Sequence, residues 1–219
     1  MPCFTRNFCK KSRYRAGVYV ASKNAPFKTY QEFEAYAKAN PGKVRAALTN
    51  FPSSIHSGLT YFLTKLAKLD VQLITQPTSP LDGAIDTLTG ITDILITHTP
   101  DAERFVKHGD FVVLATFNKN RLPMLPDVPT LHELGYAYDQ TSWRCIVVNK
   151  DTPDEIVEAL TVAFKKAMET PEVKKSAEDN WEPLAYLPPK ETQQFLEDEL
   201  KFYEDLTKKL GIHWSQSKK

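Results

Sequence analysis

The sequence predicts an α/β fold with a mainly parallel β-sheet, and three observations support that class. Short apolar runs alternate with longer segments in which apolar residues recur at helical spacing. Residues 111–117 (FVVLATF) are almost continuously apolar, as in a strand that is covered on both faces of a parallel sheet. Three successive turns between a strand and the next helix share one chemistry of Ser, Thr and Pro. Alternation of this kind is typical of βαβ units with parallel strands.

The elements before residue 50 follow from one clear capping signal. Thr29 followed by Glu32 forms a capping box, which satisfies backbone N–H groups at both residues and starts a helix at Tyr30. Residues 40–42 (NPG) end this helix because proline and glycine both interrupt helical structure. The elements expected in this part are a strand at residues 17–23, a helix at 30–39 and a strand at 44–48.

The three strand-to-helix turns come next. Residues 49–53 (TNFPS), 76–80 (QPTSP) and 97–100 (THTP) each place hydroxyl-bearing residues at a helix start. In the second turn Ser-Pro provides an N-cap and a first-turn proline, and Leu81, Ile85 and Leu88 follow at i, i+4 and i+7. The elements expected here are helices at 54–68, from residue 80 and at 100–108, with strands at 71–75 and 92–96.

The C-terminal half begins with the strand at 111–117. Residues 118–140 are rich in proline and turn residues, and three Thr-Pro or Pro-Pro pairs further on mark helix starts. The elements expected are a short helical piece at 130–134 and a strand at 143–149. Three helices are expected after them, at about 153–168, 171–179 and 190–210.

Composition excludes several classes of protein. The 219 residues, 42% of them hydrophobic, can bury one sizeable core or two small ones. Lys and Arg (28) balance Asp and Glu (27), so the chain lacks the overall field that attracts nucleic acid or anionic membranes. The three cysteines show neither disulfide-framework nor metal-ligand spacing. No apolar run is long enough for a membrane span. The segment 1–16 is rich in Lys and Arg but lacks the apolar region of a signal peptide.

Small polar residues gather where the expected parallel strands end, which is the edge of an α/β sheet at which ligands bind. Helix N-termini there offer free N–H groups and partial positive charge to small anions such as carboxylates. The candidate ligand-binding residues are Asn50, Phe51, Ser53, Ser54, His56, Thr78, Ser79, Thr97, His98, Thr99 and Trp143. Capping is the commoner role of any single Ser or Thr here, and a Trp that opens a strand more often packs in a core or domain junction. Their joint placement at successive strand ends favours a shared site.

No arrangement of residues indicates catalysis. His56 and His98 could act as general bases, but neither lies at a recognisable spacing from a nucleophile, and no G-x-S-x-G, H-E-x-x-H, Walker or dinucleotide-binding motif occurs. Asp93 and Asp101 flank the third turn, where a carboxylate more often stabilises a helix terminus. We therefore expect no catalytic residue, no metal site and no cofactor.

Several longer segments carry a family resemblance. Residues 125–136 (LPDVPTLHELGY) are followed by Trp143 and by the segments 147–173 (VVNKDTPDEIVEALTVAFKKAMETPEV) and 202–212 (FYEDLTKKLGI). Upstream stand residues 29–44 (TYQEFEAYAKANPGKV), the S-x-H of Ser54 and His56, and residues 90–115 (GITDILITHTPDAERFVKHGDFVVLA). From Gly17 on, the chain thereby resembles the solute-binding receptors of tripartite tricarboxylate transporters, the Bug family.

This resemblance implies a periplasmic binding protein of the two-lobed, hinge-closing type, which holds a carboxylated metabolite between its lobes and docks on a membrane permease. Binding by such receptors involves no chemistry, and closure is a hinge motion. The lobes implied are a complete second lobe at residues 24–117, a crossover and hinge region at 118–141, the rest of the first lobe at 17–23 and 142–219, and an irregular segment at 1–16.

The sequence also departs from the family pattern. The export signal and the glycine-rich first turn of family members have no counterpart, so the chain is expected to be truncated within the first lobe, with an exposed sheet edge that favours self-association. Pro52 and Phe51 replace the small residues usual in one ligand-binding turn. Residues 76–79 (QPTS) replace the tyrosine-lysine-glycine turn that is usual before the third helix. The alternatives are a cytoplasmic ligand-sensing regulatory module of the same fold, a small α/β enzyme, or a degraded gene product.

Overall fold

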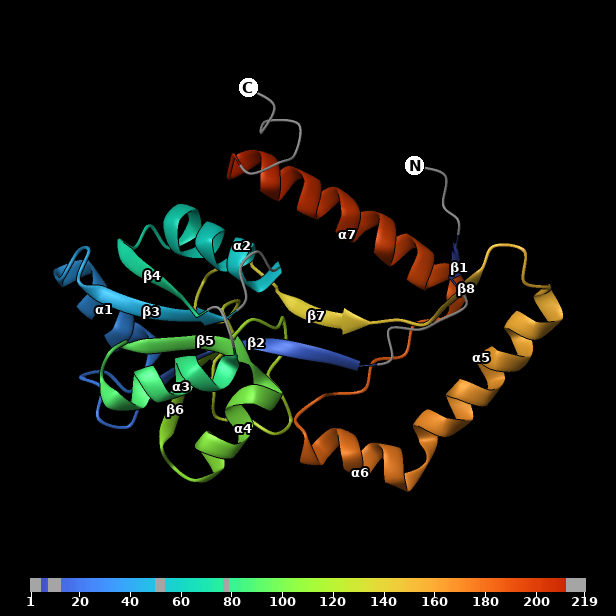
Figure 1. Cartoon of the computed structure of the whole chain (residues 1–219), viewed down its shortest axis with the longest axis horizontal. Coiled ribbons are helices and arrows are strands. Elements are labelled where there is room, and N and C mark those ends of the chain that lie inside the picture. The colour runs from blue at the N-terminus through green and yellow to red at the C-terminus, as the bar shows by residue number, and fades with distance from the viewer. Residues whose placement is uncertain (1–4, 8–12, 50–53, 77–78, 212–219) are drawn as a thin grey trace. The chain divides into compact units, whose positions relative to one another are not determined.

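The computed structural model describes residues 5–7, 13–49, 54–76 and 79–211. The chain divides into two compact units (Figure 1). Unit 1 comprises Met1–Arg15 and Trp143–Lys219, and unit 2 comprises Ala16–Ser142. Helices alternate with strands in unit 2, and its sheet is mainly parallel, so the α/β class expected from the sequence is confirmed.

Unit 2 is built on a sheet with the strand order β4-β3-β5-β2-β6, to which β7 is added beside β2. Strand β3 pairs in parallel with β4 on one side and β5 on the other. Strand β2 is the exception, since it runs antiparallel to both β5 and β6. The strands are β2 (Arg13–Ser22), β3 (Val44–Thr49), β4 (Val71–Gln76), β5 (Ile94–His98), β6 (Phe111–Thr116) and β7 (Thr141–Arg144).

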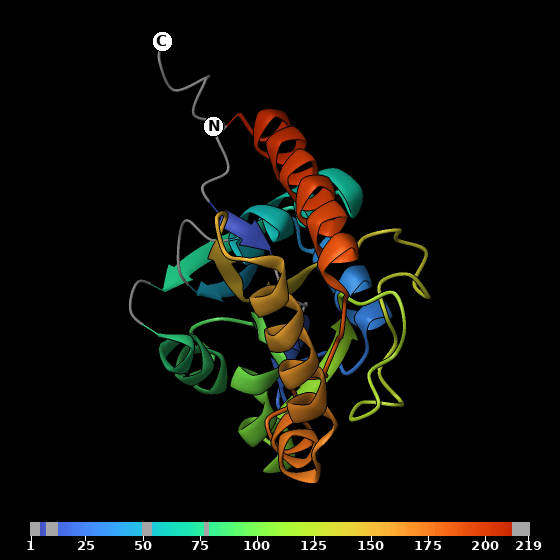
Figure 2. The ribbon, with the colours of Figure 1, turned by 90° about the vertical axis from the view of Figure 1, so that its right-hand side faces the viewer.

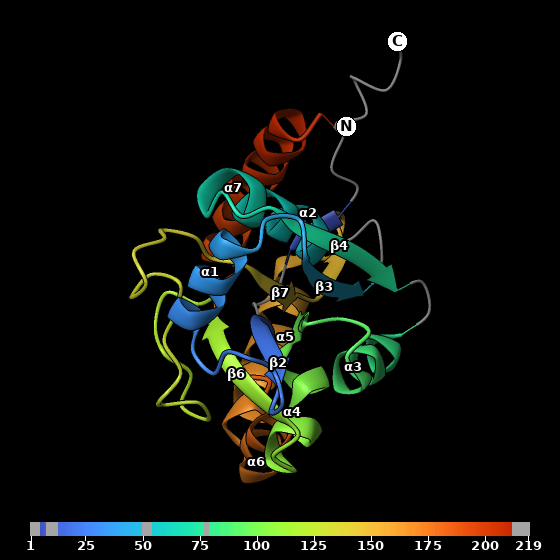
Figure 3. The same ribbon diagram turned by 90° about the vertical axis from the view of Figure 1, so that its left-hand side faces the viewer.

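The helices of unit 2 cover both faces of this sheet. From β3 to β4 the chain steps outward, and from β4 to β5 it steps back across β3, so right-handed connections place α2 and α3 on opposite faces. Figure 3 shows α1 and α2 on one face and α3 and α4 on the other. The helices are α1 (Tyr30–Ala39), α2 (Ser54–Tyr61), its π-helical continuation η1 (Phe62–Leu66), α3 (Pro80–Thr89) and α4 (Thr99–Lys107).

Aromatic rings form the core between the sheet and helices α1 and α2. Tyr19 of β2 packs against Tyr30, Phe33, Phe62 and Phe117, with ring centroids between 4.7 and 6.1 Å apart. All five side chains are fully buried. Burial raises the pKa of Tyr19 and Tyr30 well above the usual value, so both phenols stay neutral. Because buried aromatic rings contribute large apolar areas, this cluster fixes α1 and α2 against the sheet.

Unit 1 contains a two-stranded antiparallel sheet of β1 (Thr5–Asn7) and β8 (Val147–Asn149). Its helices are α5 (Asp154–Glu169), α6 (Pro171–Asp179) and α7 (Pro189–Lys209), which Figure 2 shows in orange and red. The α5 helix buries Val157 against a small cluster, whereas Ile156 on the same helix is 50% exposed. An ion pair joins Arg15 Nε to the buried Glu182 Oε1 at 2.6 Å. Burial raises the pKa of the Cys145 thiol.

Several boundaries differ from the sequence-based expectations. Residues 130–134 form one hydrogen-bonded turn rather than a helix, because the turn ends at Gly135 with a φ of 90°. The strand expected at 143–149 is interrupted and becomes β7 and β8. The helix expected at 54–68 changes to π-helical hydrogen bonding at Phe62. Segment 1–16, expected to be irregular, includes β1 and the start of β2.

Gly58 is a point of close packing between α2 and the chain that leads into β7. A Cβ atom at residue 58 would overlap the side chains of Gln140 and Tyr138, which are buried and joined by a 2.7 Å hydrogen bond from the Tyr138 hydroxyl. We predict that Gly58→Ala lowers the free energy of unfolding by about 1–3 kcal/mol through overpacking. Urea denaturation measures this loss.

The control is Ala35→Gly on the exposed side of α1. It measures helix propensity alone, where glycine costs about 1 kcal/mol relative to alanine. If Gly58→Ala proved as stable as the natural protein or more so, propensity would outweigh packing and the described contact would be contradicted.

Candidate ligand-binding site

The carboxyl ends of three parallel strands lie at one edge of the unit 2 sheet. The register pairs Thr49 with Gln76 and Leu48 with Ile96, so β3, β4 and β5 end at nearly the same level. Helices α2, α3 and α4 begin just after these strand ends, at Ser54, Pro80 and Thr99. Each helix start carries backbone N–H groups without intrahelical partners and partial positive charge. The edge therefore collects three electropositive helix ends.

The strand order marks one position along this edge. Strand β3 continues through α2 to β4 on one side, whereas β5 continues through α4 to β6 on the other. Such a divergence is a topological switch point, where open α/β sheets form a ligand-binding crevice. The turn that follows β3 and the turn between β5 and α4 are therefore the favoured ligand-binding turns. The turn before α3 lies one strand further out.

Part of the predicted site lies outside the described residues, namely Asn50, Phe51, Ser53 and Thr78. Ser54 and His56 occupy the first turn of α2, and the structure describes their backbone but not their side chains. The predicted site residues whose side chains are described are Ser79, Thr97, His98, Thr99 and Trp143.

His98 ends β5 and is the N-cap residue of α4, without a side-chain cap hydrogen bond. Its Nε2 atom lies 2.9 Å from the Ser142 hydroxyl oxygen, and its Nδ1 atom lies 3.9 Å from Oδ2 of Asp101. Thr97 donates to the same carboxylate oxygen at 3.5 Å. The imidazole is thus held between the first turn of α4 and the β7 residue Ser142.

Thr97 and Thr99 are fully buried beside this histidine. Thr97 faces Asp101, and Thr99 is the first residue of α4. Asp101 in that first turn stabilises the positive end of the helix, as expected for a helix-terminus charge. The donors that the α4 start offers outward are therefore mainly its backbone N–H groups and the imidazole.

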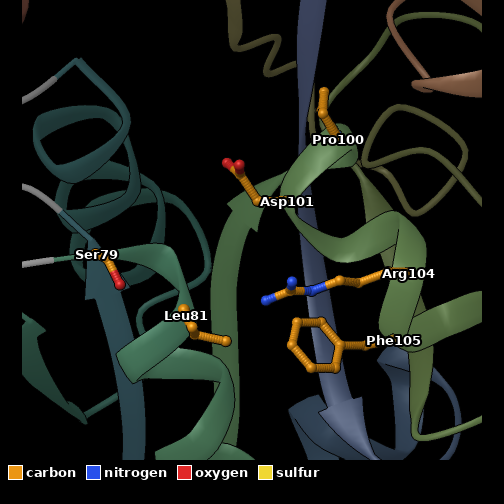
Figure 4. Close-up of a pocket in the computed structure, with 6 residues that line it drawn as sticks. All are labelled: Ser79, Leu81, Pro100, Asp101, Arg104 and Phe105. Carbon is orange, nitrogen blue, oxygen red and sulfur yellow. The ribbon is translucent and has the colours of Figure 1, made fainter.

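A cavity of about 290 Å³ opens between the N-terminal ends of α3 and α4 (Figure 4). Its lining residues are Ser79, Leu81, Pro100, Asp101, Arg104 and Phe105. Of these only Ser79 was among the predicted ligand-binding residues. Arg104 and Phe105 lie one turn after Asp101 on α4, and the helical spacing from the predicted turn at 97–100 is the signal that could have identified them.

Trp143 belongs to unit 1 and contacts two residues of α7 there. The indole Nε1 donates to Glu199 Oε2 of α7 at 2.7 Å, and the ring packs edge-on against Phe195 with centroids 5.3 Å apart. The sequence allows two roles for Trp143, ligand stacking and packing. The contacts with α7 are packing contacts.

Asp93 does not flank the third turn as the sequence suggested. It precedes β5 at the opposite end of the strand and accepts hydrogen bonds from Arg45, with Nη2 to Oδ1 at 3.0 Å and Nε to Oδ2 at 3.2 Å. The pair holds the amino ends of β3 and β5 together. Asp93 is thereby removed from the candidate site.

Within residues 5–7, 13–49, 54–76 and 79–211, no group of three or more His, Cys, Asp or Glu side chains could hold a metal ion. Across the same described part of the chain, no helix combines the length and apolarity needed to cross a membrane.

The fold is an open α/β sheet with three helix starts along one edge. The model of the tripartite tricarboxylate transporter family receptor matches residues 10–212. The chain therefore belongs to this family, whose members are solute-binding receptors and not enzymes.

Among curated relatives, a protein from Cupriavidus necator described as "UPF0065 protein in gbd 5'region" is 35% identical over 205 residues, which cover 93% of this chain and 61% of that protein. Protein BugT of Bordetella pertussis is 24% identical over 81% of this chain and 54% of its own length. The chain thus spans roughly half to three fifths of the length of these relatives.

Solved structures show the same fold. R. palustris Rpa4515 with adipate matches with a TM-score of 0.79 and 19% identity, over 93% of this chain and 68% of that one. MatC from Rhodopseudomonas palustris with bound malate matches with a TM-score of 0.71 and 20% identity, over 92% and 69%. The periplasmic binding protein BugD matches with a TM-score of 0.78 and 19% identity, over 95% and 70%.

The role of Ser79 can be separated from ordinary capping. Ser79 is the N-cap residue of α3 but makes no side-chain cap hydrogen bond, whereas Thr29 accepts one from the Glu32 N–H at 3.2 Å. We predict that Ser79→Ala changes the free energy of unfolding by less than about 0.5 kcal/mol. The matched Thr29→Ala change should cost about 1 kcal/mol. Equal losses in urea denaturation would show that Ser79 is an ordinary cap.

Proposed function

We propose that this chain captures a small carboxylate as the solute-binding receptor of a tripartite tricarboxylate-type transporter. Membership of the receptor family supports the general role. The adipate and malate in the names of two structural relatives support carboxylates as the ligand class. The periplasm is the proposed compartment, and membrane components of the transporter are the proposed partners.

The observation that carries this proposal is the common level at which β3, β4 and β5 end. A carboxylate placed above this edge would accept hydrogen bonds from N–H groups at more than one helix start. The chain's near-zero formal charge of +1 supplies no general attraction for anions, so affinity for a carboxylate depends on these local donors.

The two switch-point turns are assigned the principal contacts. In this proposal Asn50, Ser53 and Ser54 offer amide, hydroxyl and backbone donors from the start of α2. His98 and the backbone at Thr99 offer donors from the start of α4. Phe51 and His56 border the first group, while Thr78 and Ser79 extend the site toward α3 and select for longer diacids. No covalent step is involved, because capture needs only differential binding.

The lobe boundaries remain part of the proposal. Residues 24–117 would form the second lobe, 118–141 the crossover, and 17–23 with 142–219 the first-lobe portion. In sequence, the two compact units meet between residues 15 and 16 and between residues 142 and 143. The proposed lobe boundary between residues 141 and 142 lies beside the second of these, whereas residues 17–23 fall in unit 2.

A thermal-shift titration tests the proposal with malate and adipate as probes. A ligand that binds only the folded protein raises the melting temperature by mass action. We predict that both acids raise it and that Ser54→Ala or His98→Ala weakens the malate shift by about tenfold in apparent Kd, as expected for losing a hydrogen bond to a charged group.

Thr29→Ala is the control, because it removes a helix cap distant from this edge. It should lower the melting temperature of the free protein and leave the malate-induced increase unchanged. Absence of a shift with either acid, or equal malate shifts in all variants, would refute carboxylate capture at this edge.

A further inference from the structure

Helix α3 exposes its large apolar side chains. Leu81, Ile85 and Leu88 are 43%, 47% and 36% exposed, and Ile91 just beyond the helix is 55% exposed. We call these four residues the α3 stripe. Spacing of i, i+4 and i+7 usually marks the face that a helix buries against its own domain. Here the same spacing marks the solvent-exposed face.

Small side chains form the buried face of α3 instead. Gly83, Ala84 and Thr87 are buried, and α3 packs on β3, β4 and β5. The Thr87 hydroxyl donates to the Gly83 carbonyl and lies 2.8 Å from the Thr92 hydroxyl. The helix is therefore seated mainly by these small side chains, while 36–55% of each side chain in the α3 stripe stays exposed. A stripe of this length on a soluble domain is a feature of interaction surfaces.

The cavity between α3 and α4 adjoins the N-terminal end of the α3 stripe. Leu81 forms one wall, and Arg104 and Phe105 face it from α4 (Figure 4). The guanidinium carbon of Arg104 lies 4.6 Å from the centroid of the Phe105 ring, a cation–π contact that holds the side chain in place. Among the described residues, Arg104 takes part in no salt bridge, and its side chain is exposed.

Asp101 does not neutralise this arginine. Its carboxylate lies near His98 and Thr97, and Figure 4 shows it pointing away from Arg104. The α3 and α4 helix starts beside the cavity add partial positive charge. The cavity thus combines apolar walls with an exposed guanidinium, which suits a carboxylate carried next to apolar groups.

We propose that the α3 stripe and this cavity dock an acidic, apolar segment of a membrane component of the transporter, which places its carboxylate against Arg104. The choice of partner rests on the proposed function. A protein segment fits better than a small acid because α3 has 10 residues and extends about 15 Å, so the stripe continues well past the cavity. The segment would contact Ile85 and Leu88 with apolar side chains at helical spacing.

Binding of a designed peptide to the full chain tests this surface. The probe is a fluorescent amphipathic helical peptide with leucines at i, i+4 and i+7 and a glutamate beside the first leucine, measured by anisotropy. Ile85→Asp and Arg104→Glu should each weaken its binding about tenfold or more, as expected for central interface residues. Leu200→Asp, at an exposed residue of α7 in unit 1, is the matched control and should leave binding unchanged.

A charge exchange makes the test specific. A second peptide with lysine in place of the glutamate should bind Arg104→Glu more tightly than it binds the natural chain. Absence of binding by the first peptide, or equal affinity in all variants, would overturn the proposal. So would analytical ultracentrifugation showing a dimer that Ile85→Asp dissociates, because a second copy would then occupy the surface.

The malate thermal shift of the same variants separates the two proposals. An unchanged malate shift in Arg104→Glu supports docking of a protein segment, whereas loss of that shift assigns the cavity to the small ligand and overturns docking. If the natural chain binds neither malate nor adipate but shows the expected peptide pattern, the proposed function fails while the docking surface stands.

Discussion

Parallel pairing of β3 with β4 and β5 is the constraint on which the remaining structure depends. This pairing sets three strand ends at one level, so α2, α3 and α4 must begin along the same edge of the sheet. The aromatic cluster around Tyr19 anchors the α1 and α2 side of that sheet, and the Arg45–Asp93 pair joins β3 and β5 at their other end. Helix starts held in this way offer anion-binding N–H groups in fixed positions, which is the physical basis of the proposed carboxylate site.

The opposite face of the sheet follows a different principle. There α3 is seated by Gly83, Ala84 and Thr87, while Leu81, Ile85 and Leu88 remain exposed. In the two proposals, the exposed side of α3 and the cavity at its start serve a partner, whereas the starts of α2 and α4 make the main contacts with the ligand. The His98–Ser142 hydrogen bond adds a link from the α4 start to β7, close to the residue at which the two compact units meet in sequence. The proposed carboxylate site and the proposed docking surface thus occupy neighbouring parts of unit 2.

Sequence reasoning found the elements whose signals are local. The capping box of Thr29 and Glu32 gave the limits of α1 correctly, and the repeated hydroxyl and proline turns located the starts of α2 and α3 and placed the start of α4 within one residue. It missed features that depend on distant partners. Helical spacing of Leu81, Ile85 and Leu88 gives a period but not the face that meets the sheet, and the antiparallel course of β2 depends on pairing with residues far along the chain. Asp93 was misplaced because its partner Arg45 is remote in sequence.

The most direct test of the shared helix-start edge is an amide NMR titration of the full chain with malate. The account predicts that the largest changes in backbone N–H signals fall in the first turns of α2 and α4, with smaller changes at the start of α3. Each of these N–H groups belongs to a helix end that lacks intrahelical acceptors. Changes confined to α5, α6 and α7, or absent throughout the assigned signals at saturating malate, would contradict it.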